Sequence, residues 1–169
     1  ADIWNADELG LVYAQTLLKS LARPGDEMEG FKKNKARVTV LPFVSAGGVV
    51  EALYVLSKAK KPRGLQVVDG VTYHGTKRGY MTRPKCFEIL SDVSARLRAA
   101  SPNRKVLLFL DGPQVHKFSH EQEAELDNIK LAYLPENTTP FTQPCDAGVI
   151  HAFKSAYRRL IVQQRFERY

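Results

Sequence analysis

Residues 105–111, Lys105-Val106-Leu107-Leu108-Phe109-Leu110-Asp111, carry the clearest strand signal in this chain. They form its most hydrophobic strand candidate, as expected of a central strand that is covered on both faces of a parallel sheet. A second apolar run, Ile3 to Asp7, also ends in an aspartate. We therefore predict two buried strands, one ending at Asp7 and the other at Asp111.

The other predicted elements follow from apolar periodicity and turn signals. Three further strands are predicted at 37–45, 51–57 and 129–134. Helices are predicted at 13–21, from Thr82 or Arg83 onward, around 120–126 and from Asp146 onward. The residues Ala46-Gly47-Gly48 separate two of the strands and indicate a hairpin.

This order of elements predicts an α/β fold with a mixed five-stranded sheet and helices on both faces. The sheet would begin antiparallel and finish parallel. In such a sheet the first strand lies beside the 105–111 strand, which brings Asp7 next to Asp111. No repeat or low-complexity segment interrupts the pattern, so we expect one domain over residues 1–169.

A third aspartate, Asp146, stands at the start of the last predicted helix. That helix carries an apolar stripe, and Asp146 precedes its first member by four positions, so the carboxylate is expected to face the sheet. The stripe consists of Ile150, Phe153, Tyr157, Leu160 and Ile161. Each aspartate taken alone is more often a turn former or helix cap. Three converging carboxylates, however, suit a hard divalent cation, and the joint pattern predicts metal-dependent phosphoryl transfer.

The charge of the chain favours a polyanionic partner. Its 169 residues carry a formal net charge of +7. The basic residues cluster in or beside predicted loops and on the last helix, and we expect six of them to bind nucleic acid through its phosphates: Lys58, Lys60, Lys61, Arg63, Lys154 and Arg158. Three loop clusters are present, at 32–37, 58–63 and 77–85.

Two classes of protein are disfavoured by the composition. The two cysteines, Cys86 and Cys145, are too few for a disulfide framework, and no Cys/His cluster has zinc spacing, which favours a reducing compartment. No stretch of 18 apolar residues is present, so no membrane span is expected.

Several motifs resemble the DDE superfamily endonuclease domain of pogo and Tigger transposases. They are Asn5-Ala6-Asp7-Glu8, the 58–63 segment, Tyr80-Met81-Thr82, the 107–111 strand, the 134–139 segment and Gln143-Pro144-Cys145-Asp146 with the residues that follow it to Lys154. This family belongs to the mariner superfamily and includes centromere protein B and jerky. The 34 residues between Asp111 and Asp146 are the spacing of an Asp-Asp-Asp member. The resemblance covers nearly the whole chain and implies a ribonuclease H-like fold.

The resemblance implies a site and its cofactors. Asp7, Asp111 and Asp146 would be the catalytic residues and the ligands of two Mg²⁺ or Mn²⁺ ions, acting on a DNA phosphodiester in the nucleus. His116 would be an accessory residue that orients water or phosphate, with a structural histidine as an equally good alternative. Glu8 is interpreted as structural. The oligomeric state stays open, with a homodimer of the full-length protein as one alternative.

Departures from the family pattern leave three functions open. Leu9, Gly112-Pro113, Val115, Cys145 and Ala147 stand where the family usually has other residues. The leading function is an active, divergent endonuclease and strand-transfer domain, and the second is a domesticated, non-catalytic DNA- or chromatin-interaction module. The third, ranked well below these two, is a ribonuclease or other nuclease on the same fold. No helix-turn-helix region of the kind that reads terminal repeats is evident in these residues. Binding through the DNA backbone, with little sequence preference, is therefore expected.

Overall fold

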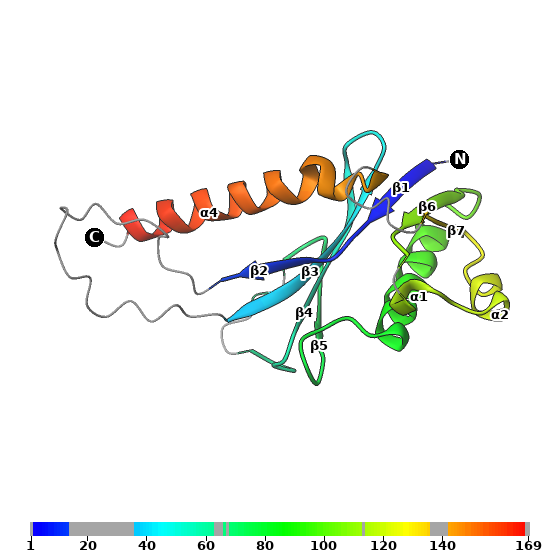
Figure 1. The fold of residues 1–169 in the computed structure, drawn as a ribbon, viewed down its shortest axis with the longest axis horizontal. Helices are drawn as coiled ribbons and strands as arrows, with labels where there is room; N and C mark the ends of the chain where they lie inside the picture. The colour runs from blue at the N-terminus through cyan, green and yellow to red at the C-terminus, as the bar shows by residue number, and fades with distance from the viewer. Residues whose placement is uncertain are drawn as a thin grey trace.

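The computed structural model describes residues 2–13, 36–62, 66, 68–112, 114–135 and 142–167. Figure 1 shows a sheet with helices on either side of it. The strands are β1 (Asp2–Ala6), β2 (Leu9–Val12), β3 (Arg37–Ser45), β4 (Val50–Ser57), β5 (Val71–Gly75), β6 (Val106–Leu110) and β7 (Ile129–Tyr133). The helical elements are α1 (Arg83–Ala100), η1 (Gln114–His116), α2 (His120–Ala124), η2 (Cys145–Val149) and α4 (Ile150–Phe166).

The sheet is mixed, as predicted, but has seven strands instead of five. Its order is β5-β4-β3-β1-β6-β7, and β2 pairs with β3. The β1–β3, β2–β3 and β3–β4 pairs are antiparallel, whereas β1–β6, β6–β7 and β4–β5 are parallel. The two unexpected strands are β2, which continues the line of β1 after Asp7 and Glu8, and the edge strand β5. The predicted hairpin is the β3–β4 connection, where Gly48 has a φ of 80° that favours glycine.

Helix α1 covers one face of the sheet. It begins where the sequence predicts, with Thr82 as the residue before the first turn and Pro84 inside that turn. Its inward stripe includes Leu90, Val93 and Leu97, which join Trp4, Phe43, Tyr54 and Leu108 of the sheet in the main core. Each such buried side chain contributes about 1.5–3 kcal/mol relative to exposure, so this layer fixes α1 on β1, β3, β4 and β6.

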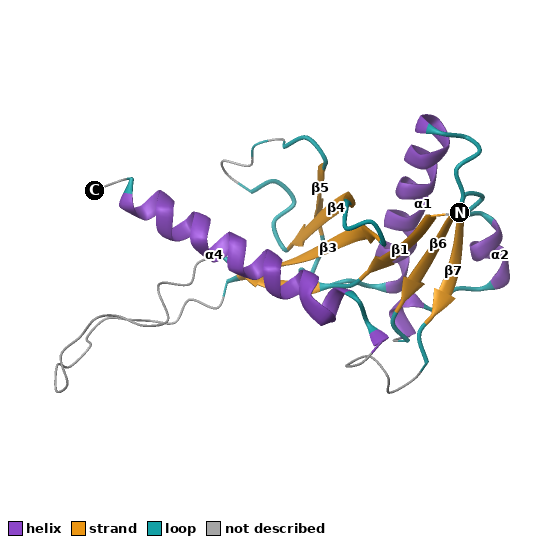
Figure 2. Cartoon of the chain, turned by 90° about the horizontal axis from the view of Figure 1, so that it is seen from above, coloured by secondary structure: helices purple, strands orange, loops and turns teal. Residues whose placement is uncertain are grey.

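Helix α4 lies over the opposite face (Figures 1 and 2). Ile150, Phe153 and Tyr157 pack on a second, smaller core centred on Leu9, Leu11 and Val40. The predicted stripe is therefore correct for its first three members. Leu160 departs from it and is 58% exposed, because the described part of this core ends with β2 and the adjoining ends of β3 and β4.

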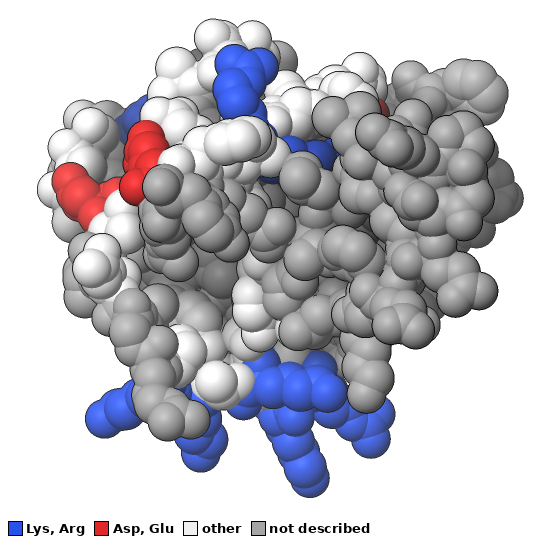
Figure 3. Space-filling view, turned by 90° about the vertical axis from the view of Figure 1, so that its left-hand side faces the viewer, with Lys and Arg blue, Asp and Glu red and all other residues white. Residues whose placement is uncertain are grey.

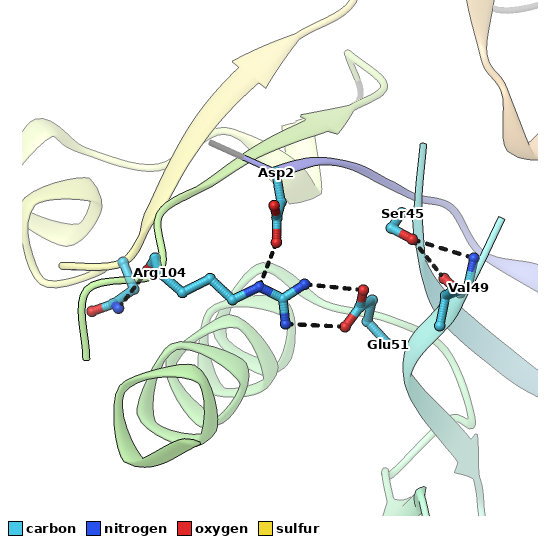
Figure 4. A network of polar contacts seen from close by, with 6 residues as sticks. Asp2, Ser45, Val49, Glu51 and Arg104 are labelled. Carbon is cyan, nitrogen blue, oxygen red and sulfur yellow. Dashed lines mark hydrogen bonds and ion pairs between the residues drawn. The ribbon is translucent and has the colours of Figure 1, made fainter. Parts of the chain in front are cut away.

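An ion-pair network fixes the end of β1 that lies away from Asp7. Arg104, which precedes β6, contacts Asp2 and makes two hydrogen bonds to Glu51 of β4, at 3.1 and 3.3 Å (Figure 4). Its guanidinium also stacks over the Trp4 ring, 5.3 Å from the ring centroid. These contacts link β1, β4 and the start of β6 in one register.

Two further expectations concern helices. Tyr13 is not helical, and the rest of the predicted 13–21 helix lies outside the described residues. None of the described helices is both long and apolar enough to cross a membrane.

Candidate functional site

Asp7 and Asp111 follow the ends of two adjacent strands. β1 and β6 are parallel, with Asn5 opposite Phe109, so both chains leave the sheet at the same edge. Asp7 directly follows Ala6, the last residue of β1, and Asp111 directly follows Leu110, the last residue of β6. The predicted adjacency of these two aspartates is confirmed.

Asn5 connects these two strand ends to the segment that carries Asp146. Its side-chain amide donates to the carbonyl of Phe109 at 3.0 Å and to Oε1 of Gln143 at 2.7 Å. Its Oδ1 accepts from the backbone N–H of Cys145 at 2.9 Å. Asn5 is only 6% exposed, and a buried amide with all these partners holds its neighbours in a fixed relation.

Sequence analysis did not single out Asn5 or Gln143 as positioning residues. One signal was available, because Asn5 is a polar residue inside the apolar run Trp4 to Ala6, whose members are buried. A polar side chain at such a position needs buried partners.

Asp146 lies on a distorted turn before α4. Residues 145–149 form a π-helical turn, and Gly148 has φ 171° and ψ −32°, which kinks the chain before Ile150. The regular spacing that related Asp146 to the α4 stripe is therefore interrupted, and Asp146 is exposed. It remains close enough to Asp7 for electrostatic repulsion between the two carboxylates to raise the pKa of Asp7.

The pKa of the Asp7 carboxyl group is strongly shifted. Burial is the main cause that raises its pKa from 3.8 to about 7, and repulsion from Asp111, Asp146 and Glu8 adds to it. A hydrogen bond from the Glu8 backbone N–H to Oδ1, 2.8 Å long, acts in the opposite direction. Asp7 is thus a carboxylate that binds a proton near neutral pH when no cation is present.

His116 joins two carboxylates at this edge. It is 2% exposed, with Nε2 3.1 Å from Oε1 of Glu8 and Nδ1 2.6 Å from Oδ1 of Asp111. The angles of the Asp111 contact are poor for a hydrogen bond, so it is best described as an ion pair. Burial alone would lower the pKa of His116, but Asp111 and Glu8 outweigh it and raise the pKa to about 10. Glu8, which the sequence analysis interpreted as structural, therefore contacts His116 directly.

The donors are of the type that Mg²⁺ and Mn²⁺ prefer, although they are not drawn together into a cage. Within the described ranges, no group of three or more His, Cys, Asp or Glu side chains is already arranged to hold a metal ion. Asp111 is paired with His116, and Asp7 accepts a hydrogen bond from the Glu8 backbone N–H, so each carboxylate still has oxygen lone pairs for a cation. The chemistry of this donor set fits a hard divalent cation.

The predicted nucleic-acid-binding residues occupy two places. Lys58, Lys60 and Lys61 are exposed in the segment that follows β4, and Arg63 lies outside the described residues. Lys154 is half-buried and Arg158 exposed on α4, which covers the other side of the sheet. Figure 3 shows Lys and Arg side chains gathered along one edge of this end of the molecule, with others toward the opposite edge. The two groups therefore form separate surfaces.

Both cysteines are buried and free. Cys145 directly precedes Asp146, and its backbone N–H donates to Asn5 Oδ1. Burial, with Asp7 and Asp146 nearby, raises the pKa of its thiol to about 12, so the thiol stays protonated.

Comparison with known proteins supports the sequence resemblance. The model of a family described as DDE superfamily endonuclease matches residues 35–168. CENP-B homolog protein 2 of Schizosaccharomyces pombe is 32% identical over 167 residues, which cover 94% of this chain and 32% of that protein. Tigger transposable element-derived protein 7 of Homo sapiens is 26% identical over 175 residues, which cover 94% of this chain and 31% of that protein. The chain thus spans about a third of the length of these relatives.

Solved structures agree on the fold. The Mos1 transposase paired-end complex with left transposon end gives a TM-score of 0.59 at 14% identity, covering 91% of this chain and 41% of that chain. The crystal structure of the Mos1 mariner paired end complex with Mn gives a TM-score of 0.58 at 15% identity, covering 92% and 42%. The predicted ribonuclease H-like α/β fold is confirmed, as is the resemblance to pogo and Tigger proteins. This chain belongs to the DDE superfamily endonuclease family.

Proposed function

We propose that residues 1–169 are a single catalytic domain that cleaves and joins DNA with divalent metal ions, in a pogo/Tigger-like transposase or a nuclear protein derived from one. The observation that carries this proposal is the meeting of Asp7 and Asp111 at one sheet edge, with Asp146 close enough to raise the pKa of Asp7. A site for phosphoryl transfer requires such a set of oxygen donors.

Asp7, Asp111 and Asp146 would hold the ions, two Mg²⁺ or Mn²⁺ per site. When bound, divalent ions supply Lewis-acid stabilisation of charge on the phosphate and lower the pKa of an attacking water. One of the similar Mos1 structures is a complex with Mn, which supports the choice of metal.

The other residues of the site act on these three carboxylates. His116 restrains Asp111 and partly neutralises it, and Glu8 holds His116 from the other side. Asn5 keeps the 143–145 segment against β1 and β6, so that Asp146 stays beside Asp7. Cys145, in the same segment, is fully buried.

DNA is the proposed substrate. The other similar Mos1 structure is a complex with a transposon end, and the net charge of +7 on this chain favours a polyanion. Lys58, Lys60, Lys61 and Arg63, with Lys154 and Arg158, would contact phosphates in a way that is insensitive to base sequence.

A second candidate is a non-catalytic DNA- or chromatin-interaction module. Among the described residues no metal-holding group is preassembled, and His116 already pairs with Asp111. The family that the motifs resemble includes centromere protein B as a domesticated relative, and the similarity to CENP-B homolog protein 2 therefore also favours this alternative. In that case DNA binding would persist without metal-dependent chemistry.

A plasmid-nicking assay in Mg²⁺ or Mn²⁺ tests the proposal. The native chain should convert supercoiled plasmid to nicked circles, and Asp146→Ala should bind the same DNA without nicking it. If native protein and Asp146→Ala nick equally little while both bind DNA, the catalytic proposal fails and the interaction module is favoured.

A further inference from the structure

The far end of the β2–β3–β4 sheet contains a pocket that is separate from the three aspartates. It has a volume of about 220 Å³ and is lined by Tyr13, Arg37, Ser57, Lys58, Arg78, Gly79 and Tyr80. Tyr13 follows β2 and lies six residues beyond Asp7, so the two are on the order of 20 Å apart along the extended strand. Neither Arg37 nor Arg78 belongs to the set of residues assigned above to DNA binding.

The pocket is positively charged without compensation. Three of its lining residues are cationic and none is acidic. In the part of the chain that the structure describes, Arg37, Lys58 and Arg78 form no ion pair with a carboxylate, whereas Arg96, Arg98 and Arg104 each do. Three converging cations that repel one another are stabilised by an anion.

One of the three cations is held in a fixed orientation. The Arg37 guanidinium lies over the Tyr80 ring, 5.1 Å from its centroid, and donates to the Tyr80 hydroxyl at 3.0 Å. Such stacking limits the rotamers of the side chain and leaves its remaining N–H groups available. A guanidinium restrained in this way loses less entropy when it binds a phosphate with two parallel hydrogen bonds.

The backbone of the pocket wall is also fixed. The Gly79 carbonyl accepts from Thr39 Oγ1 at 3.0 Å, and Thr76 N–H donates to the Ser57 carbonyl at 2.8 Å. Gly79 has a φ of 72°, and a Cβ placed there would come within 3.3 Å of the Lys58 backbone nitrogen. Glycine therefore lets the segment after β5 approach Lys58 closely, which brings Arg78 to the same pocket.

We propose that this pocket binds a phosphate group of the nucleic-acid backbone, with Arg37 and Arg78 as its principal ligands. The inference rests on the proposed function, because DNA supplies the phosphate. A volume of about 220 Å³ is below the roughly 300–1,000 Å³ of sites for drug-sized ligands, so it suits a phosphodiester and part of a sugar better than a whole nucleotide.

The experiment measures DNA affinity of the full 169-residue chain across salt concentrations by fluorescence anisotropy. The test variant is Arg37→Gln/Arg78→Gln. The matched control is Arg98→Gln/Arg96→Gln, which removes the same charge from α1.

The test variant should weaken duplex binding at least tenfold and lower the log–log salt slope by about 0.9 for each phosphate that is no longer neutralised. The control should keep the native slope. Equal slopes for the test and control variants overturn the proposal.

A second measurement guards against misfolding and separates the two sources of phosphate. In native protein, the Nε–Hε NMR signals of Arg37 and Arg78 should shift when a short DNA duplex is added, whereas those of Arg98 should not. Inorganic phosphate is titrated in parallel. If it shifts these signals but duplex DNA does not, the pocket is a free-anion site and its assignment to nucleic acid is overturned.

Failure of the pocket proposal and failure of the proposed function give different results. If only the pocket proposal is wrong, native protein still binds DNA with a salt-dependent affinity and the two double variants behave alike. If only catalysis is absent, nicking is lost, yet the difference between the two double variants remains.

Discussion

The side chain of Asn5 donates a hydrogen bond to Oε1 of Gln143 across 2.7 Å, although the two residues are 138 positions apart in the chain. Both are buried, and Asn5 also holds the backbone of Cys145 and of Phe109. The three segments that carry Asp7, Asp111 and Asp146 therefore meet at one amide. The relative placement of the three carboxylates depends on this contact as much as on the sheet.

Asn5→Ala tests this dependence. The substitution leaves Gln143 and the Cys145 N–H without partners in a buried region, so the free energy of unfolding should fall by about 1–3 kcal/mol for each group left unpaired. Mn²⁺ affinity, measured by calorimetry, should fall about 10- to 100-fold, as expected when a residue that orients metal ligands is removed.

Asn128→Ala is the matched control for that prediction. Asn128 is also buried and donates to the carbonyls of Arg104 and Pro102, at 2.8 and 3.3 Å, before the other end of β6. It should lose comparable stability while keeping native Mn²⁺ affinity. Equal losses of Mn²⁺ affinity in both variants would mean that Asn5 acts only through global stability.

Divalent metal should stabilise the native chain. A ligand present at 100 times its dissociation constant stabilises the folded state by about 2.7 kcal/mol, and relief of the repulsion among Asp7, Asp111 and Asp146 provides the driving force. Thermal unfolding should show a higher melting temperature in millimolar Mn²⁺. Asp111→Asn should abolish most of that rise, whereas Asp127→Asn, at an exposed pair with Arg98, should keep it. A full rise in Asp111→Asn would refute the assigned ligand set.

Stability without metal should fall as the pH rises. The pKa of Asp7 is about 7 in the folded protein, against an ordinary aspartate value of 3.8 in the unfolded chain, so between these values the folded chain binds a proton that the unfolded chain releases. The stabilisation that this bound proton gives the folded chain is complete below about pH 4 and lost above about pH 7. His116, with a folded pKa of about 10 against 6.5, extends the decline from pH 6.5 to 10.

Asp7→Asn separates the two groups. In the presence of a chelator, it should flatten the decrease in unfolding free energy between pH 4 and 7 and leave the decrease above pH 7 in place. Urea unfolding across the pH range measures both. Parallel curves for native protein and Asp7→Asn would show that Asp7 titrates normally.

Sequence reasoning predicted the features that local patterns encode. The apolar runs before Asp7 and Asp111, the 46–48 hairpin and the stripe of α1 each carry a periodic signal that survives in the fold. β5 was missed because it is a half-buried edge strand inside a Gly-rich, basic stretch. β2 was missed because its four residues follow directly on a strand that already ended in a carboxylate.

The parts of the site that were missed depend on long-range contacts. The Asn5–Gln143 bond and the Glu8–His116 pair join residues more than 100 positions apart, and such contacts leave no periodicity in the sequence. The kink at Gly148 was hidden for another reason. A helical pattern predicts where the apolar face lies but not where the first turn is distorted, so the expected alignment of Asp146 with the α4 stripe did not anticipate the π-helical turn.

DNA binding should depend on the exposed lysines after β4. Lys60→Gln/Lys61→Gln should weaken binding to all duplexes alike and lower the log–log salt slope by up to about 1.8, that is about 0.9 for each of two phosphate contacts. Lys105→Gln/Lys130→Gln removes the same charge near β6 and β7 and should leave the slope near its native value. A difference in affinity among duplex sequences that disappears in Lys60→Gln/Lys61→Gln would contradict a role limited to phosphates.

His116 should remain protonated at pH 8, held between Glu8 and Asp111. In NMR titrations its imidazole should lose the proton only near pH 10. His74 should be neutral at pH 8, because burial and the nearby Lys85 lower its pKa.

Glu8→Gln removes one of the two carboxylates beside His116 and should lower the pKa of His116. The corresponding change beside His74, Glu88→Gln, should leave His116 unaffected because Glu88 contacts His74. Mn²⁺ that draws Asp111 away from Nδ1 should also lower the pKa of His116. If neither Glu8→Gln nor Mn²⁺ changes the titration of His116, this residue does not report on the charge of the site, and its proposed restraint of Asp111 is wrong.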